Sequence, residues 1–361
     1  MDERIFNFSS GPAAMPLQVL ERARAEILSI KGSGMSVMEI SHRSELFGGI
    51  LAAAERGIRE LLNIPNNYSV IFTQGGATQL FSVIPMNFLD VGETAAFILT
   101  GVWGEKAAAA ANSYGNANII YSGKDDGYTK VPAQDELNIP AGSKYVHYTS
   151  NETIDGVEFH YDLDGGGVPV VCDASSNILS KPIDTERYDL IYAGAQKNIG
   201  PSGVTVVIVR NDFLKIGAHR NIPGVMDMQR LAKENSMVNT PNTWGIYLIS
   251  LVCEWLIGQG GVEAIAGRNN AKADLLYNAI DSSDGFYAGN AEPASRSKMN
   301  VTFRLNSEEL TEQFCREASL IGLDGLRGHR SVGGVRASIY NAMPKEGVER
   351  LVEFMEDFRT K

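Results

Sequence analysis

Helix-like and strand-like patterns alternate along this chain from about residue 16 to residue 260. Seven short apolar runs have the length and composition of buried strands. They cover residues 68–73, 94–99, 117–121, 144–149, 169–173, 188–192 and 203–209. Strands that alternate with helices typically form a parallel sheet covered by helices. The sequence therefore predicts an α/β domain built on one seven-stranded, mostly parallel sheet.

Amphipathic patterns predict the helices of this domain. One apolar stripe follows Pro16, a residue that suits the first turn of a helix, and a second stripe follows it. The two stripes comprise Leu17, Leu20, Ala23 and Ile27, and Leu46, Ile50, Ala54, Ile58 and Leu61. An apolar helix near 244–257 ends at a glycine-rich break, and the rest reads as helix, strand, helix, strand, helix. We predict a large domain over residues 16–260 and a smaller α+β domain from residues 1–15 and 261–361.

Composition excludes several classes of protein. The 361-residue chain has a net charge of −11, which argues against a surface for nucleic acids, so phosphate recognition needs a local cluster of Arg and His. No stretch approaches the roughly 18 apolar residues of a membrane span, and the N-terminus lacks the form of a signal peptide. We expect a cytoplasmic protein with no membrane partner. Three widely spaced cysteines predict neither a disulfide framework nor a metal site.

One lysine, Lys197, stands between two predicted strands in a turn bounded by glycines. A buried ammonium is costly unless it is neutralised, paired or used covalently, although a lone lysine here could simply snorkel out of a strand end. Asp173 ends another apolar strand. It could cap a following helix or supply a carboxylate beside the lysine. The pair suggests pyridoxal phosphate, whose aldehyde bonds to a lysine and whose ring nitrogen needs an anionic partner.

Two further strand ends carry features that suit this cofactor. Gly75-Gly76-Ala77-Thr78 joins a strand to a helix, where free backbone N–H groups and a hydroxyl can hold a phosphate, although a plain tight turn explains the glycines as well. The segment lacks the third glycine and the lysine of a nucleotide-binding P-loop. Trp103 follows the next strand and could stack on a pyridine ring or fill the core.

Three of the five histidines stand directly before an arginine. His42-Arg43 and His329-Arg330 lie in glycine- or serine-containing loops, where ligand contacts are common, and Arg336 follows in a glycine-rich strand. A planar guanidinium suits a carboxylate or a phosphate. The third pair, His219-Arg220, has no supporting motif, and we interpret it as solvated surface.

With these residues, the chain resembles the phosphoserine aminotransferases, in the class V branch of the pyridoxal-phosphate aminotransferases with the aspartate-aminotransferase fold. The resemblance runs nearly from end to end. It rests on five motifs, at residues 7–13, 36–43, 151–156, 193–203 and 328–343. The last of them, Gly-His-Arg-Ser-Val-Gly-Gly-Val-Arg-Ala-Ser-Ile-Tyr-Asn-Ala-Met, is very specific.

The resemblance implies a fold type I enzyme and a role for each matching residue. Lys197 would form the Schiff base, Asp173 would pair with the pyridine nitrogen, Trp103 would stack on the ring and Thr153 would contact its hydroxyl. The phosphate cup would comprise Ala77, Thr78 and Gln196 from one subunit with Asn239 and Thr240 from its dimer mate. Substrate binding would fall to Ser10, His42, Arg43, His329, Arg330 and Arg336. Some members carry arginine where this chain has Thr78, so phosphate discrimination would rest more on Arg43 and Arg330.

The implied reaction moves an amino group from L-glutamate to 3-phosphohydroxypyruvate and gives 2-oxoglutarate and O-phosphoserine, in serine biosynthesis. The longer phosphorylated 2-oxo acid of pyridoxine synthesis is a second possible substrate, because one extra carbon changes binding only modestly.

Two rival functions stay open. One is a cysteine desulfurase of the same fold, which needs a nucleophilic thiolate on a mobile loop, whereas Cys172 falls in a strand and Cys253 and Cys315 fall in helical patterns. The other is a non-enzymatic nucleotide-binding α/β protein, supported only by the α/β pattern and Gly75-Gly76.

Overall fold

All seven predicted strands form one sheet in the computed structural model, which describes residues 4–217 and 220–361. The strand order is β2-β10-β9-β8-β5-β3-β4, and only β10 runs antiparallel to its neighbours. The strands are β2 (Tyr68–Gln74), β3 (Thr94–Leu99), β4 (Asn116–Ser122), β5 (Val146–Thr149), β8 (Val170–Asp173), β9 (Leu190–Gly194) and β10 (Val204–Arg210). The predicted α/β class and mostly parallel sheet are confirmed.

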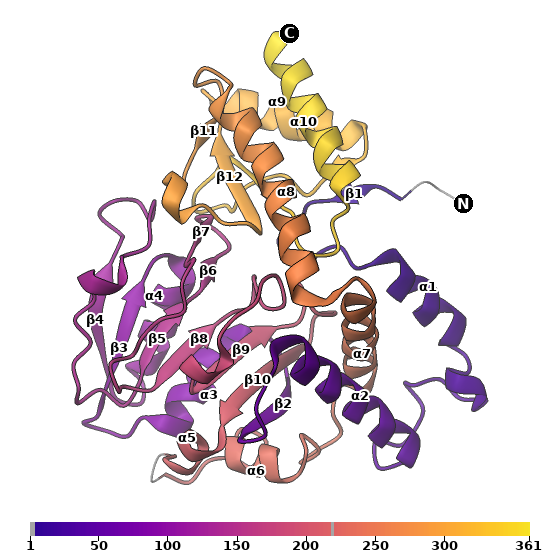
Figure 1. Ribbon diagram of the computed structural model, residues 1–361, viewed down its shortest axis with the longest axis vertical. Coiled ribbons are helices and arrows are strands. Elements are labelled where there is room, and N and C mark those ends of the chain that lie inside the picture. Colours follow the sequence, from indigo (N-terminus) through magenta and orange to yellow (C-terminus); the bar gives the residue numbers. More distant parts are fainter. Residues whose placement is uncertain (1–3, 218–219) are drawn as a thin grey trace.

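Helices cover both faces of this sheet because the strands carry apolar side chains on both (Figure 1). On β10, Val206 and Ile208 face a core that includes α2 (Glu45–Leu62) and α7 (Thr243–Gly258). Val207 and Val209 face the opposite core, which includes α3 (Ala77–Phe88) and α4 (Val102–Ala111). The smaller helices α5 (Asn211–Lys215) and α6 (Met228–Lys233) lie below the sheet in this view.

The first predicted helix exists as α1 (Leu17–Glu26), but of its predicted apolar stripe only Ala23 is buried. Its buried residues are Val19 and Ala23, whereas Leu17 and Leu20 are 48% and 37% exposed. Ile27, 37% exposed, lies just beyond the helix. The helical spacing is as predicted, but one chain covers these three side chains only in part. The second predicted stripe does face the core, through Ile50, Ala54, Ile58 and Leu61.

The C-terminal part begins with α8 (Gly261–Asp281) and forms a smaller α+β unit (Figure 1). Its other elements are β11 (Ala288–Gly289), β12 (Asn300–Arg304), α9 (Glu308–Leu320), β13 (Leu323–Asp324), β14 (Val335–Ser338) and α10 (Lys345–Thr360). The N-terminal strand β1 (Phe6–Asn7) pairs with β13, and Phe8 joins the core of this unit. The helix α8 contributes Val262 and Ile265 to the sheet's core and Leu276 to the C-terminal core.

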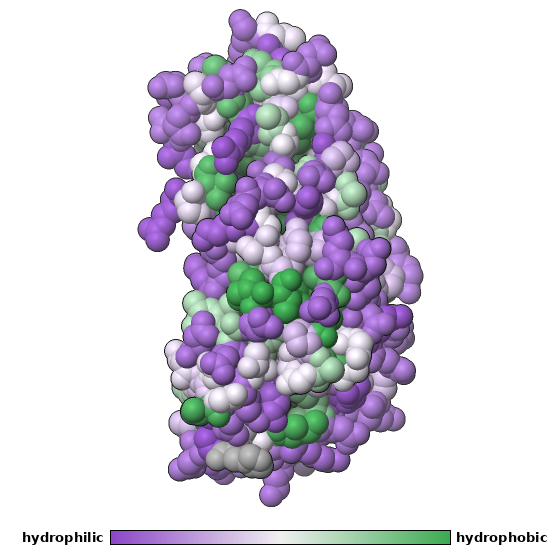
Figure 2. Space-filling view, turned by 90° about the vertical axis from the view of Figure 1, so that its left-hand side faces the viewer, coloured by the Kyte–Doolittle hydropathy of each residue, from purple (hydrophilic) through white to green (hydrophobic). Residues whose placement is uncertain are grey.

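The edge strand β4 is largely exposed, and the face of the molecule on its side is mainly hydrophilic, with apolar residues gathered near the middle (Figure 2). Within residues 4–217 and 220–361, no single helix is long and apolar enough to cross a membrane. Only α7 and α8 together meet that criterion, as a pair bent by 81°.

Candidate functional site

Lys197 lies in the turn between β9 and β10, and its amine reaches a neighbouring hairpin. Its Nζ donates a hydrogen bond of 2.5 Å to Oγ1 of Thr153, which follows β6 (Asn151–Glu152) and precedes β7 (Val157–Glu158). Burial lowers the pKa of Lys197 to about 8, although Asp173 and Glu152 act in the opposite direction. A lysine with this pKa has a substantial neutral fraction near neutral pH, which covalent chemistry requires.

Asp173 ends β8 and is buried beside the lysine turn. It does not cap a helix, because residues 174–177 form a turn, where the backbone N–H and the hydroxyl of Ser175 donate to Oδ1 at 2.9 and 2.5 Å. Burial raises the pKa of Asp173, while the Lys197 ammonium lowers it. The Lys197 ammonium and the two Ser175 hydrogen bonds favour the ionised form of this buried carboxyl group.

Two residues behind Asp173 were not predicted from the sequence. Tyr192 interacts with Asp173 and, through a 2.9 Å hydrogen bond between its hydroxyl and Nε2, with His147 of β5. Burial lowers the pKa of His147 to about 3, so this imidazole is neutral. Both residues lie inside apolar strands. The only feature of the sequence that could have indicated them is a polar side chain within a run of buried residues.

Trp103 is the second residue of α4, and its ring lies close to two lysines. Lys197 Nζ is 5.6 Å from the ring centroid, and Lys106 Nζ is 4.4 Å from it. Lys106 is exposed and was not predicted, although its position three residues after Trp103 puts both on one helix face. Among the described residues, the buried Nε1 of Trp103 is one of the few polar side-chain atoms without a hydrogen-bond partner.

A buried acidic side chain, Glu152, which was not predicted from the sequence, binds the first turn of this helix. The Glu152 carboxylate accepts hydrogen bonds from the backbone N–H groups of Trp103, at 3.1 Å, and Gly104, at 2.9 Å. A side chain at Gly101 would meet Glu152 and Asp155 at 2.4 and 2.6 Å, so only glycine allows this approach. Burial and the charge of the neighbouring Asp155 together raise the pKa of Glu152 to about 8. The only feature of the sequence that could have indicated Glu152 is its position beside Thr153 in the motif at residues 151–156.

The predicted phosphate cup lies at the start of α3. Ala77 and Thr78 are its first two residues, and the N-cap residue Gly76 makes no side-chain cap, so the first N–H groups remain available to an anion. The Gln196 amide lies beside them, since a Cβ on Gly194 would meet both Gln196 Oε1 and the Ala77 nitrogen.

Asn239 and Thr240 are exposed in the segment between α6 and α7. The Thr240 carbonyl accepts a hydrogen bond from Nε2 of Gln74, the last residue of β2, on the strand that leads into the cup. The structure therefore places this segment near the edge of the phosphate cup of its own chain.

The N-terminal segment and β14 meet beside Thr153. Arg336 is buried, donates to Ser10 Oγ at 2.7 Å and reaches the Thr153 carbonyl at 3.4 Å. Tyr340 donates its hydroxyl to the Ser10 carbonyl at 2.8 Å. Burial lowers the pKa of Arg336, and no ion pair with a carboxylate is present for it within the described residues. Its charge is therefore available to an anionic ligand.

His329 and Arg330 lie in the loop before β14, the first half-buried and the second exposed. Burial lowers the pKa of His329, and the positive charges of Arg336, Lys106 and Arg330 lower it further. Basic side chains from α4 (Lys106), from this loop (Arg330) and from β14 (Arg336) therefore lie close together at the entrance of the site. Such a cluster favours a ligand with two anionic groups.

His42 and Arg43 are not brought to this cluster. They lie in the turn before α2, and within the described residues no hydrogen bond or ion pair joins their side chains to the other predicted site residues. The segment between α1 and α2 lies on the opposite side of the molecule from β3 and β4 (Figure 1). Of the third pair, His219 lies outside the described residues, and Arg220 forms an ion pair with Asp90 at 3.3 Å.

The cysteines do not suit a lyase that needs a thiolate. Cys172 lies in β8, Cys253 in α7 and Cys315 in α9, and burial raises their pKa values to about 12, 12 and 11. In the part of the chain that the structure describes, no group of three or more His, Cys, Asp or Glu side chains could hold a metal ion.

The residues fit pyridoxal phosphate. The amine of Lys197, the buried Asp173, the Trp103 ring and the uncapped start of α3 surround one region at the ends of β8, β9 and β2. Gln196 Oε1 and Trp103 Nε1 are buried there without partners in the described chain, as expected of groups that face a polar ligand.

Comparison with known proteins agrees with this geometry. The aminotransferase class-V family model matches residues 5–351. Phosphoserine aminotransferase of Geobacillus kaustophilus is 50% identical, over 99% of each chain. The structure of phosphoserine aminotransferase from Bacillus circulans subsp. alkalophilus has a TM-score of 0.97 at 46% identity and 99% coverage of both chains. The enzyme of Trichomonas vaginalis, with pyridoxal phosphate bound, has a TM-score of 0.93 at 37% identity, covering 98% of this chain and 100% of that one. The expected fold type I architecture is confirmed, and the chain belongs to the class V aminotransferases, within them to the phosphoserine aminotransferase family.

Proposed function

We propose that this chain is a pyridoxal-phosphate-dependent transaminase that interconverts L-glutamate and 3-phosphohydroxypyruvate with 2-oxoglutarate and O-phosphoserine. The observation that carries the proposal is the position of Lys197, between Asp173 and Thr153 and beside a cationic mouth formed by Lys106, His329, Arg330 and Arg336. Its relatives over the full length are phosphoserine aminotransferases.

The cofactor, when bound, supplies a reactive aldehyde and a ring that withdraws electrons from the substrate's α-carbon. Lys197 would hold that aldehyde at rest. Its Nζ, once free, would accept and return the α-proton, a task that suits an amine with a pKa of about 8. Asp173 would accept a hydrogen bond from the protonated ring nitrogen, and Trp103 would pack on the ring.

Arg336 binds the α-carboxylate that all the substrates share, because its guanidinium lies beside Ser10 and Thr153, close to Lys197. The second anionic group, a phosphate or a side-chain carboxylate, binds farther out at His329 and Arg330. Lys106 adds a cation there, which compensates for Thr78 at the position where some members carry arginine. The longer phosphorylated oxo acid of pyridoxine synthesis is a second substrate of the same cluster.

The active unit is a homodimer with composite sites. Exposed apolar side chains around α1 support an interface with a second copy: Leu20, Ile27, Leu28, Met35 and Met38. A second copy also accounts for His42 and Arg43, which are far from the cluster within one chain. Asn239 and Thr240 would complete the phosphate cup of the partner. The large domain would comprise residues 16–260, and the enzyme would work in the cytoplasm on soluble metabolites.

The test is transamination by the purified holoenzyme. With O-phosphoserine and 2-oxoglutarate it should form glutamate at a far higher kcat/KM than with serine or alanine as donor. Borohydride should fix the cofactor to Lys197, which peptide mass mapping detects. Equal rates with serine and O-phosphoserine would contradict the assigned substrate, and no reduced adduct at Lys197 would contradict the assigned chemistry.

A further inference from the structure

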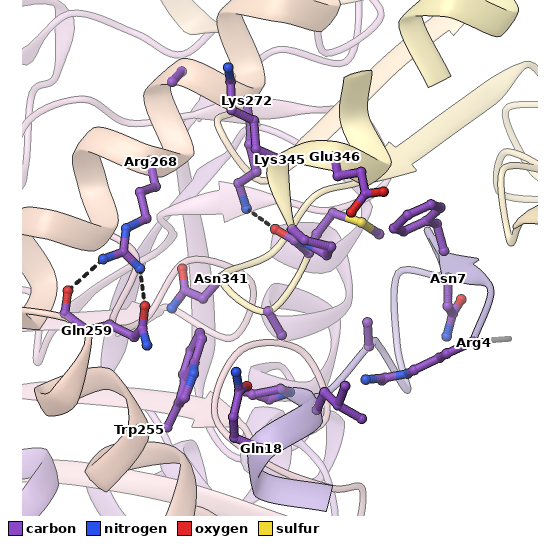
Figure 3. A pocket seen from close by; sticks show the side chains of 18 of the residues that line it. Arg4, Asn7, Gln18, Trp255, Gln259, Arg268, Lys272, Asn341, Lys345 and Glu346 are labelled. Carbon is purple, nitrogen blue, oxygen red and sulfur yellow. Dashed lines mark hydrogen bonds between the residues drawn. The ribbon is translucent and has the colours of Figure 1, made fainter. Parts of the chain in front are cut away.

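A large cavity lies on the molecule away from Lys197 (Figure 3). Its walls come from the N-terminal segment, the end of α7, the helix α8 and the loop that leads into α10. Its volume is about 770 Å³, within the range of small-molecule sites in proteins. Neither Lys197 nor any other residue of the proposed active site lines it.

Three basic side chains around this cavity are bonded only to neutral oxygens. Arg4 donates to the Met15 carbonyl at 2.8 Å, and Arg268 donates to the carbonyl and the side-chain oxygen of Gln259. Lys272, only 3% exposed, donates to the carbonyls of residues 339, 340 and 343 at 2.8, 2.7 and 3.1 Å. The neutral partners fix these side chains without compensating their charges.

Carboxylates do not balance this charge. Among the described residues, no ion pair involves Arg4, Arg268 or Lys272. Glu346 is the one acidic residue of the lining, and Lys345 beside it is paired with Glu349 at 2.8 Å. The field of Arg268 adds to burial in lowering the pKa of Lys272, to about 7. The lining of this cavity is therefore net positive, although the chain as a whole has a charge of −11. Such a local concentration of positive charge favours an anionic ligand.

The remaining wall is apolar and partly aromatic. The indole of Trp255 stands between Arg268 and Gln18 in Figure 3, and Phe6, Leu17 and Met343 also line the cavity. An indole presents a flat surface on which a planar or aliphatic body packs. The cavity therefore combines an apolar platform with fixed positive charge.

We propose that this cavity is a binding site for a small organic anion with a flat apolar body, such as an aromatic carboxylate or sulfonate. The anionic group lies against Arg268, the body packs on the neighbouring Trp255, and Arg4 adds positive charge from the opposite wall (Figure 3). This site is separate from the active site, and the inference does not depend on the proposed reaction.

The cavity is connected to the lysine turn. Asn341 lines it, and its backbone N–H donates to Oδ1 of Asn198, the residue after Lys197, at 3.0 Å. Tyr340, whose carbonyl accepts from Lys272, donates its hydroxyl to Ser10. An occupant thus contacts the same loop that supports the catalytic lysine, which gives the site a physical route to influence activity.

The test uses the holoenzyme and the fluorescent aromatic sulfonate 8-anilinonaphthalene-1-sulfonate. Wild type should bind one equivalent per chain, and the affinity should fall as NaCl rises. Arg268→Gln should weaken binding at least tenfold, and Arg4→Gln, on the opposite wall, should weaken it less; neither variant should change the melting temperature or the rate with O-phosphoserine. Arg56→Gln, an exposed arginine of α2, is the matched control and should bind as wild type does.

Three outcomes would overturn the proposal. They are the absence of saturable binding to wild type, unchanged affinity in Arg268→Gln, and displacement of the dye by O-phosphoserine in simple competition, which would put it in the active site. Trp255→Leu gives an independent check, because it should weaken the dye while leaving the charges in place.

Discussion

The Glu152 carboxylate holds the backbone N–H of Trp103 at 3.1 Å, so a buried acid sets the position of the indole that faces Lys197. Glu152 comes from the hairpin that also carries Thr153, and Trp103 comes from the first turn of α4. Two segments about fifty residues apart in sequence are thereby fixed to each other next to the amine.

Glu152→Gln should make the stability of the apoprotein less sensitive to alkaline pH. The pKa of Glu152 is raised from 4.5 to about 8 by burial and by Asp155, so the folded state binds its proton more tightly than the unfolded state does. Its stabilising contribution is complete below pH 4.5 and is lost as the pH rises towards 8. Because each Glu152 oxygen accepts a backbone N–H and a glutamine amide offers only one acceptor, the variant should melt below wild type at pH 6, and this gap should narrow by about 2 to 4 °C between pH 6 and pH 9.

The control is Glu158→Gln, another buried glutamate. Lys181, at 3.0 Å, is among the groups that lower the pKa of Glu158 despite its burial, so its contribution is present at high pH and lost on acidification. This variant should lose stability at pH 9. The same melting-temperature trend in both variants would show that charge at Glu152 is not the cause.

Lys197→Ala should bind pyridoxal phosphate reversibly and turn over negligibly, because it loses both the covalent anchor and the proton carrier. Dialysis should remove the cofactor from the variant, and borohydride should leave no reduced adduct on the chain. Lys124→Ala, which removes an exposed lysine paired with Glu105, should behave as wild type does. Near-wild-type transamination by Lys197→Ala would remove this residue from the mechanism.

Much of this arrangement follows from local sequence, and the rest depends on contacts that local sequence does not encode. The seven strands were predicted because each is a short apolar run, and Lys197, Asp173 and Trp103 because each follows such a run. The exposed face of α1 was misread because periodicity reveals an apolar stripe but not what covers it. Glu152 and Lys106 act through α4, and only the fold brings them to Trp103. The domain boundary at residue 260 and the site roles stay predictions.

Arg330→Ala should weaken phosphorylated substrates by about 1.5 to 3 kcal/mol, the scale of a hydrogen bond to a charged group. Arg43→Ala should behave similarly. Arg336→Ala should instead impair every amino acid and oxo acid, since the α-carboxylate is common to all of them. Steady-state kcat/KM for O-phosphoserine and alanine separates the two classes, and equal losses for both donors in Arg330→Ala would refute this division of labour.

Lys106→Ala should raise the KM for O-phosphoserine about five- to twentyfold and leave that for alanine nearly unchanged. The reason is that Lys106 is exposed at the mouth of the site, where its charge acts on His329. Lys106→Arg should restore most of the affinity. Calorimetric titration with 3-phosphoglycerate, which has both anionic groups but cannot transaminate, should show the same loss. If KM rises equally for alanine, Lys106 acts by supporting Trp103 and not by binding the anion.

The composite model predicts that two inactive homodimers complement each other. Lys197→Ala and the double variant Asn239→Ala/Thr240→Ala should each be crippled alone. If Asn239 and Thr240 serve the partner's cofactor, a mixed dimer has one site with both defects and one with neither. Random reassembly of equal amounts makes half of the dimers mixed, so activity should recover to roughly a quarter of wild type. The measurement is activity after reversible dissociation and mixing, with exchange confirmed by differently tagged chains. Exchange without recovery would assign Asn239 and Thr240 to the site of their own Lys197 and refute the composite model.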